Sequence, residues 1–506
     1  MRIILSYLFL LTILSPIQAQ VSGQSSGYTL YSPLSSTTTY LLDEYGNIYH
    51  QWDCSSSPAS TAHLLPDGSI MRPYRVPSPS MTGGAVGGGV QRISWDGVIL
   101  WEYTWSSPNH QQHHECIPIA QDDGTYNALI ISWERKTNLE AIQAGRQDVD
   151  GEMWPTEIIE IKPDGLTGGT VVWEWHFWDH LCQDIDAEKD NYYADGCHNH
   201  PELFDINKVD INVGFQGNGG DWIHANGIDY SPELNQIVFS SHYAHEIYVI
   251  DRGTTTEEAA SHEGGAANSG GDFLYRWGNP QNYGAGTEDD QILYVVHGAN
   301  FIDAGYPGEG NIMVFNNGDR PGLSNDYSSV EEIIPSKNYA LPWNQDQHWI
   351  YSNGSSFYSN HLSGAFRLPN GNTLATEGTS CRITEVNPDG EVVFQYTHSG
   401  SGNQNNVAKA TFYSDQYEGI IDIHTSIQEK TDQNVYIYPN PAQHYLTIKS
   451  DSNAKVVILD VAGRIVLKYS SQSSVKRIDL SNLKEGVYFV RAMTEKDLTI
   501  QKLVIR

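Results

Sequence analysis

The stretch Gly220–Tyr230 reads Gly-Asp-Trp-Ile-His-Ala-Asn-Gly-Ile-Asp-Tyr and places His224 just ahead of a predicted short strand. Eight residues after this histidine, Pro232 opens a turn that leads into a second predicted strand, Ile237–Ser241. The same layout of histidine, short strand and turn residue recurs around three further histidines: His114, His297 and His361. Four histidines at one position of a repeated β unit predict repeats arranged around an axis, with the imidazoles aimed at one point.

A hairpin with an aromatic closing strand also repeats along the chain. Its turns are Asp96-Gly97, Pro163-Asp164-Gly165 and Pro388-Asp389-Gly390, and each is followed by a predicted strand that contains Trp or Tyr. About five such units precede residue 400, and a strand pair expected in Ala410–Ile423 would complete a sixth unit with Tyr28–Trp52. Joining the two ends in one sheet leaves no open edge in the ring. We therefore predict an all-β fold, a six-bladed β-propeller, with seven blades as the alternative.

The composition agrees with an all-β chain and limits its partners. Glycine occurs 46 times, aromatic residues make up 11% of the 506 residues, and the formal net charge is -32. The last 71 residues, Tyr436–Arg506, are net basic, so the acidic charge is concentrated before them. A surface this acidic argues against nucleic acid as a partner, and an anionic substrate would need a local pocket of His and Arg.

The two ends of the chain predict export and a second domain. Residues 1–19 combine a basic start, an apolar run too short to span a bilayer and a small residue before the expected cleavage, which predicts a signal peptide. We expect the β-propeller at 20–427, a polar linker at 428–435 and a small C-terminal β-sandwich at 436–506, built from short alternating strands. No later stretch is apolar enough to span a membrane, so we expect a soluble exported protein.

Five cysteines are an odd number for a protein of an oxidising compartment, so at least one cannot pair within the chain. Cys182 and Cys197 bracket a polar loop in a long insertion between His114 and His224, and they can pair or remain thiols. The other three have no metal-ligand spacing and are predicted to be buried thiols: Cys54, Cys116 and Cys381.

An axial cluster of histidines could serve several chemistries. Converging imidazoles can bind zinc or copper, can act as the central residues of a lyase, or can supply a nucleophile. Arg320 favours the third hypothesis, because a guanidinium fork suits sulfate or phosphate oxygens. So do Asn226 and Asn300, which can donate hydrogen bonds to an anion, and the scarcity of carboxylates beside the histidines. A structural role for each histidine, capping a strand or bonding in the core, remains the alternative.

Several of these motifs resemble the bacterial arylsulfate sulfotransferases. The resemblance is carried by residues 173–180 (Trp-Glu-Trp-His-Phe-Trp-Asp-His), the Asp-Trp-x-His-x-Asn block at Asp221, Tyr275–Gly278, His297 and Phe315–Gly318. It implies a six-bladed propeller that transfers a sulfuryl group from a phenolic sulfate to another phenol, with no metal and no nucleotide cofactor.

The resemblance also implies roles for individual residues. By order along the chain the nucleophile, which would become a sulfohistidine, maps to His361, with His348 as the alternative. The sulfuryl oxygens and the leaving oxygen would be held by His224, His297 and Arg320. The further residues expected to contact substrate are Asn226, Asn300, His114 and Asn317.

The chain also departs from the family pattern. The predicted blades start at Tyr28 with no small sandwich before them, His242 stands where an arginine is expected, and Val296 precedes His297 where a polar residue is expected. A non-catalytic propeller that binds sulfated ligands or glycans is therefore the alternative function.

The tail resembles the C-terminal sorting domain of the type IX secretion system. The matching motifs are Tyr438–Pro441, Asp460–Arg464, Leu483–Tyr488 and Lys502–Val504. They imply export across the outer membrane by that machinery, to the cell surface or the medium. A carbohydrate-binding sandwich is the alternative for this unit.

Overall fold

The computed structural model describes residues 23–148, 151–211, 220–335, 346–399, 406–420, 435–450, 455–460, 465–470, 475–493 and 498–506. The predicted signal peptide and almost all of the predicted linker lie outside these residues. The chain divides into two compact units, Met1–Tyr417 and Glu418–Arg506. None of the described helices is long and apolar enough to cross a membrane.

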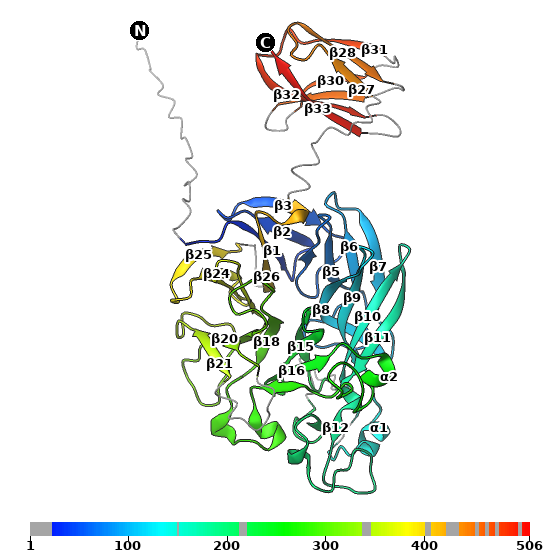
Figure 1. Cartoon of the computed structure of the whole chain (residues 1–506), viewed down its shortest axis with the longest axis vertical. Helices are drawn as coiled ribbons and strands as arrows, with labels where there is room; N and C mark the ends of the chain where they lie inside the picture. The colour runs from blue at the N-terminus through cyan, green and yellow to red at the C-terminus, as the bar shows by residue number, and fades with distance from the viewer. Residues whose placement is uncertain are drawn as a thin grey trace, which may run out of the picture. The chain divides into compact units, whose positions relative to one another are not determined.

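The described part of the first unit contains six four-stranded antiparallel sheets (Figure 1). The first three are β26(Val407–Ser414)-β1(Gly27–Pro33)-β2(Thr38–Leu42)-β3(Ile48–Asp53), β4(His63–Leu64)-β5(Ile70–Arg75)-β6(Gly88–Ile93)-β7(Ile99–Thr104) and β8(His110–Ala120)-β9(Tyr126–Glu134)-β10(Thr156–Asp164)-β11(Gly168–His176). The others are β14(Ala225–Ser231)-β15(Gln236–Ser241)-β16(Glu246–Asp251)-β17(Tyr275–Trp277), β18(Val296–Phe301)-β19(Ile312–Asn316)-β20(Ser329–Ile333)-β21(Gln347–Tyr351) and β22(Gly364–Arg367)-β23(Thr373–Glu377)-β24(Arg382–Val386)-β25(Val392–Thr397).

The first of these sheets joins the two ends of the unit. Strand β26 pairs with β1 in antiparallel register, with Tyr28 opposite Tyr413 and Tyr31 opposite Ala410. The prediction of a strand pair in Ala410–Ile423 is wrong for the described part of that stretch, which holds the single strand β26. One strand is enough, because β1, β2 and β3 already supply the other three.

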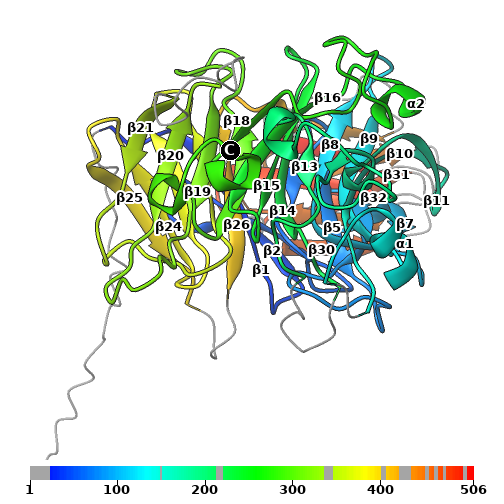
Figure 2. The same cartoon turned by 90° about the horizontal axis from the view of Figure 1, so that it is seen from below.

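We call β8, β14, β18 and β22 the leading strands, because each is the first strand of its sheet. Strands β15 and β18 lie near the middle of the first unit in both views (Figures 1 and 2). The leading strands approach one another at backbone distance: a Cβ added to Gly227 would lie 2.7 Å from Gly298 Cα, and one added to Gly298 would lie 3.0 Å from Gly364 Cα. Only glycine fits such an approach, which explains the glycines that follow three of the four repeat histidines: Gly227 after His224, Gly298 after His297 and Gly364 after His361.

Irregular backbone marks the start of each leading strand. The pairing register shifts between Gln112 and Cys116 in β8, between Ala225 and Gly227 in β14, and between His297 and Asn300 in β18. At the same level φ is positive, at 52° in His114, 51° in His224, 65° in Gly298 and 89° in Ser363. Bulges and positive φ re-aim side chains and cluster at functional sites. Because β8 begins at His110, His114 lies inside this strand, and the prediction that it stands ahead of a strand is wrong.

A long insertion separates β11 from β14. It contains η1(Phe177–Asp179), β12(Leu181–Cys182), η2(Cys197–Asn199) and β13(Phe204–Asp205). Cys182 and Cys197 form a disulfide, so the pairing left open by the sequence is settled. Phe177, Phe204 and Trp222 bury their rings in one hydrophobic cluster with this insertion and the neighbouring sheets.

The remaining elements of the first unit are short helices: α1(Asn138–Gln143), α2(Thr256–Ala259), η3(Pro280–Tyr283) and η4(Glu288–Asp290). The second unit has two antiparallel sheets, β27(Val435–Tyr438)-β28(Tyr445–Ser450)-β31(Val475–Asp479) and β30(Ile465–Ser470)-β29(Lys455–Leu459)-β32(Gly486–Met493)-β33(Leu498–Ile505). Both sheets contribute to one core that includes Ile448 and Ile478 from the first and Ile458 and Leu503 from the second.

Candidate functional site

Six histidines gather where the leading strands begin. We call them the histidine cluster: His113, His114, His224, His242, His297 and His361. Ring centroids lie 4.9 Å apart for His114 and His224, 5.3 Å for His224 and His242, and 5.4 Å for His242 and His297. His361 interacts electrostatically with His242 and His297. Four different sheets thus bring their histidines to one place.

His224 is oriented by a buried carboxylate. Its Nδ1 lies 2.5 Å from Asp221 Oδ2, and the other oxygen of Asp221 accepts a hydrogen bond from Trp133 Nε1 at 3.0 Å. Because the carboxylate only accepts, Nδ1 of His224 carries a proton, and Nε2 lies on the side of Gly84. The expected scarcity of carboxylates beside the histidines therefore does not hold at His224, because Asp221, three residues earlier, folds back onto the ring.

His297 is fixed at both ring nitrogens. Nδ1 donates to Asn317 Oδ1 at 2.7 Å and lies 3.0 Å from the carbonyl of Val295, while Nε2 accepts the main-chain N–H of Leu362 at 3.2 Å. In this arrangement the neutral ring has no N–H left to offer to a substrate oxygen. His297 thus holds the main chain beside His361, and its role of holding the sulfuryl group stays a prediction.

His113 and His114 constrain each other. Their Nδ1 atoms lie 2.7 Å apart, so one ring donates and the other accepts. His113 Nε2 is buried without a hydrogen-bond partner in the described structure. Buried N–H groups are rarely left unpaired in proteins, so we assign the proton of His113 to Nδ1, where it donates to His114. His114 then carries its proton on Nε2, where it can donate to a ligand.

His361 is the exposed member of the cluster. Its Nδ1 lies 2.8 Å from Asn360 Oδ1, an amide oxygen that only accepts. The proton therefore sits on Nδ1, and Nε2 presents its lone pair. His348, the alternative nucleophile, is also exposed but lies on β21, the fourth strand of its sheet. The histidine that this sheet contributes to the cluster is His297, which lies on the first strand, β18.

Burial keeps most of these rings neutral. Desolvation lowers the pKa of His297 to about 3, even though Asn317 and the Val295 carbonyl oppose the shift. Desolvation also lowers the pKa of His113, His114 and His242 well below the usual value, with further lowering by neighbouring histidines. The pKa of His361 is lowered by burial alone. At neutral pH these five rings are neutral imidazoles, which is the form that can attack an electrophile.

Arg320 lies in the loop between β19 and β20, and its guanidinium binds residues of the same loop. Its Nη1 donates to Asp326 Oδ1 at 2.7 Å and to the carbonyl of Tyr327 at 2.8 Å, and its guanidinium lies 4.4 Å from the Tyr327 ring centroid. No hydrogen bond or ion pair of the described residues links it to the histidine cluster. Nη1 of Arg320 is thus committed to Asp326 and Tyr327, and contact of this guanidinium with substrate stays a prediction.

The two asparagines expected to bind an anion link neighbouring sheets in this structure, and their contact with substrate stays a prediction. Asn226 Nδ2 donates to the carbonyl of Val296 at 2.7 Å, and Asn300 Nδ2 donates to the carbonyl of Ala365 at 2.8 Å. The side-chain amide of each asparagine thus donates a hydrogen bond to a main-chain carbonyl of the next leading strand. Asn317 likewise contacts protein and not an open space.

The sequence repeat does not predict three further residues of the site: His113, His242 and Tyr243. His113 lies in the bulged part of β8, and His242 follows the end of β15, where its main-chain N–H donates to the carbonyl of His224 at 3.1 Å. Tyr243 packs its ring 5.2 Å from that of His224, and burial raises the pKa of its hydroxyl so that it remains protonated. The sequence does contain a signal for these site residues: His113 adjoins His114, and the pair His242-Tyr243 follows Ser240-Ser241.

Two groups of potential metal ligands lie outside the histidine cluster. Within the described residues, the groups with three ligand atoms inside 4.8 Å are Glu134, Glu157 and His176, and His180, His262 and Asp272. Neither group contains a member of the histidine cluster.

A cavity of about 400 Å³ opens at the other ends of the leading strands. Its lining includes His63, Asp229 and Asp303, and contains no member of the histidine cluster. Between the histidine cluster and this cavity, Lys409 of β26 donates a hydrogen bond to Glu115 of β8 at 2.7 Å, and both side chains are buried.

Four-stranded antiparallel sheets whose first strands meet at a cluster of mostly neutral imidazoles define an all-β protein with a candidate site for nucleophilic or acid–base chemistry. The arylsulfotransferase (ASST) profile matches residues 35–415, and the chain belongs to this family. The profile of the secretion system C-terminal sorting domain matches residues 436–506. The protein is therefore exported by type IX secretion, to the cell surface or the medium.

Among solved structures, a protein of unknown function from Bacteroides caccae has 11% identity and a TM-score of 0.41, over 76% of this chain and 98% of that one. A protein from Lactobacillus plantarum has 10% identity and a TM-score of 0.36, over 90% and 99%. Virginiamycin B lyase from Staphylococcus aureus has 12% identity and a TM-score of 0.33, over 76% and 88%. Likenesses at this level carry no argument about function. No curated protein matches the sequence.

Proposed function

We propose that the protein is an aryl-sulfate sulfotransferase that moves a sulfuryl group from a phenolic sulfate to a phenolic acceptor through a sulfohistidine on His361. Membership of the arylsulfotransferase family supports sulfuryl transfer in general. The single observation that carries the assignment to His361 is its proton arrangement: Asn360 takes the Nδ1 proton, and Nε2 is left as a lone pair beside the other histidines.

The proposal includes an architecture. The six sheets would be the blades of one propeller, whose ring is closed by the β26–β1 pairing, and the two C-terminal sheets would form a sandwich. The domains would be a signal peptide at 1–19, the propeller at 20–427, a linker at 428–435 and the sorting domain at 436–506. Backbone approach at Gly227, Gly298 and Gly364 supports this arrangement, because it requires three leading strands to meet near an axis.

In the first half-reaction His361 Nε2 attacks sulfur, the bond from sulfur to the phenolic oxygen breaks, and a phenolate leaves. His224 in its protonated form gives the phenolate a proton, and the Asp221 carboxylate stabilises that protonated ring. His114 Nε2–H can hold a sulfuryl oxygen.

In the second half-reaction the acceptor phenol attacks the sulfur of sulfohistidine. The sulfur–nitrogen bond breaks, and the phenolic proton returns to His224. No proton is gained or lost over the cycle, and His361 regains its lone pair. His297 and Asn317 act as positioning residues that hold the main chain around His361.

The test uses purified protein with p-nitrophenyl sulfate and phenol. We expect release of nitrophenol by the wild type, loss of release in His361→Asn, and a mass increase of one sulfuryl group on His361 when the acceptor is omitted. His348→Asn is the matched control, because this exposed histidine lies on the fourth strand of its sheet. Undiminished release by His361→Asn would remove His361 as nucleophile. Binding of aryl sulfate without any release by the wild type would instead favour a binding propeller.

A further inference from the structure

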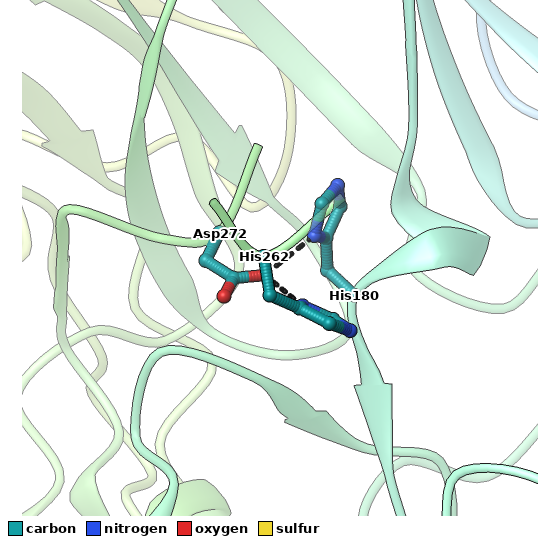
Figure 3. Close-up of side chains that lie close together, drawn as sticks. All are labelled: His180, His262 and Asp272. Atoms are coloured by element: carbon teal, nitrogen blue, oxygen red, sulfur yellow. Dashed lines mark hydrogen bonds and ion pairs between the residues drawn. The ribbon is translucent and has the colours of Figure 1, made fainter. Parts of the chain in front are cut away.

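Apart from the histidine cluster, the side chains of His180, His262 and Asp272 converge on one point, and we call them the His180 trio (Figure 3). Nδ1 of His180 lies 2.7 Å and Nδ1 of His262 lies 2.8 Å from the same oxygen of Asp272. One ligand atom of each residue lies within 4.8 Å of the other two. No hydrogen bond, ion pair or ring contact between described residues joins the trio to the histidine cluster.

The second nitrogen of His180 determines what the trio can hold. Nε2 lies 2.9 Å from the carbonyl oxygen of Ala259, which only accepts, so Nε2 carries a proton. A neutral ring then points the Nδ1 lone pair at Asp272, which as a carboxylate also only accepts. Two acceptors at 2.7 Å need a cation between them, either a proton or a metal ion. Metal-ligating histidines commonly donate their other N–H to a main-chain carbonyl, as His180 does.

The packing holds this group in place before any ion arrives. The Trp175 indole stacks on the His180 ring, with centroids 5.3 Å apart and planes 6° from parallel, and its Nε1 donates to the carbonyl of Gly271 at 2.8 Å. A Cβ at Gly271 would lie 2.6 Å from His180 Nε2, so glycine is needed beside Asp272. The disulfide at Cys182 anchors the chain two residues beyond His180. A preorganised ligand set loses little freedom on binding.

We propose that the His180 trio binds one zinc ion. Two imidazoles and one carboxylate suit zinc, whereas calcium and magnesium prefer shells made of oxygen. Three protein ligands leave one tetrahedral position for water. The side chain of His262 is 52% exposed, so the ion has a route in. Zinc lies about 2.0–2.2 Å from such ligands, which requires the nitrogens to move outward by roughly half an ångström, and the exposed His262 ring can do so.

The charges around the trio agree with a cation. Asp179 and Glu202 act electrostatically on His262 in addition to Asp272. The other candidate group is less available, because Lys136 Nζ already lies 2.6 Å from Glu134, and Glu157 accepts from both His110 and Trp105.

The positions of the ligands indicate what zinc would do. His180 belongs to the insertion after β11, while His262 and Asp272 belong to the connection between β16 and β17. One ion would therefore cross-link two segments that are far apart in the sequence, so its expected effect is on stability, with the histidine cluster unaffected.

The experiment uses the full chain, stripped with EDTA, freed of chelator and titrated with Zn²⁺ by calorimetry at constant pH. We expect one Zn²⁺ per chain and a rise of Tm when Zn²⁺ is present, because an ion that binds only the folded state stabilises it. His262→Ala, which changes an exposed side chain, should weaken binding at least about tenfold and abolish the rise of Tm. His198→Ala, an exposed histidine in the same insertion, is the control and should bind as the wild type does.

Replacement of Zn²⁺ by Co²⁺ gives a second readout that does not depend on stability. The visible spectrum of bound Co²⁺ should appear in the wild type and in His198→Ala, and disappear in His262→Ala. No binding by the wild type would overturn the proposal. Equal binding by His262→Ala would also overturn it, and would direct attention to Glu134, Glu157 and His176.

Discussion

The main-chain N–H of Leu362 donates to His297 Nε2 at 3.2 Å, so the residue next to His361 is fixed by an imidazole from the preceding sheet. Asn317 completes this connection, because it accepts from His297 Nδ1 and donates to the carbonyls of Ser359 and Leu362 at 2.7 and 2.9 Å. The loop that carries the proposed nucleophile is thus positioned on both sides of His361.

Asn317→Ala should lower kcat about 10–100-fold and leave KM nearly unchanged, because it misplaces His361 without removing a substrate contact. Steady-state kinetics with p-nitrophenyl sulfate measures both constants. Asn311→Ala is the control, because this residue precedes the same strand, β19, at its other end and binds Glu332. An unchanged kcat in Asn317→Ala would refute the positioning role.

Asp221→Asn should lower kcat about 10²-fold or more, because the amide cannot stabilise a protonated His224 as a carboxylate does. The same assay measures the loss. Asp229→Asn, at the far end of β14 and in the wall of the cavity, should keep the wild-type rate. Equal rates in Asp221→Asn and the wild type would remove His224 as the proton carrier.

The pH dependence of kcat/KM should have an acid limb below pH 6.5. Burial lowers the pKa of His361, so its neutral form, which is the nucleophile, persists to lower pH than that of an ordinary histidine. The rate should therefore fall only as the pH drops through this lowered pKa. A profile measured from pH 4 to 9 with an acid limb at or above 6.5, or with no limb at all, would contradict the assignment.

Removing one member of the buried pair Glu115–Lys409 should destabilise the fold by about 3–5 kcal/mol, because the partner is left as an uncompensated buried charge. Ser60 and the main-chain N–H of Ile228 also bind Glu115, but neither is charged. Urea unfolding measures the free energy of unfolding of the wild type, Lys409→Met, Glu115→Gln and the double variant. The double variant should lose less than the sum of the single variants, and additive losses would show that the pair is not coupled.

Acid should destabilise the protein partly through His63. Burial lowers the folded-state pKa of His63 to about 3, with Lys409 adding to the shift, whereas an unfolded histidine titrates near 6.5. Below pH 6.5 the unfolded state therefore binds more protons, so stability is full above 6.5 and falls by about 1.4 kcal/mol per pH unit toward pH 3. His63→Gln should reduce the loss of unfolding free energy between pH 7 and 5 by about 2 kcal/mol. An identical loss in both proteins would show that His63 titrates normally.

Sequence periodicity was informative where the cause of structure is local. Alternating strands and Asp-Gly turns lead to the sheets, and the repeated layout around His114, His224, His297 and His361 leads to one cluster. These features depend on backbone preferences of a few neighbouring residues.

What the sequence could not indicate depends on contacts across sheets. Asn226 is a polar residue near the histidines, but the direction of its amide depends on an acceptor from a distant segment, the carbonyl of Val296. Arg320 is held by Asp326, six residues further along the same loop, and the sequence alone does not show how that loop folds back. The inward turn of His242 likewise follows from strand ends that only the folded chain brings together.

The pairing of β1 with β26 has a consequence for synthesis. Strand β1 is made among the first residues of the unit, but its outer partner begins only at Val407. Until the ribosome has produced Ser414, β1 keeps an unpaired edge that can pair with other chains. A chain that stops before Val407 would therefore leave this edge of β1 open to pairing with other chains, and the pairing with β26 covers it.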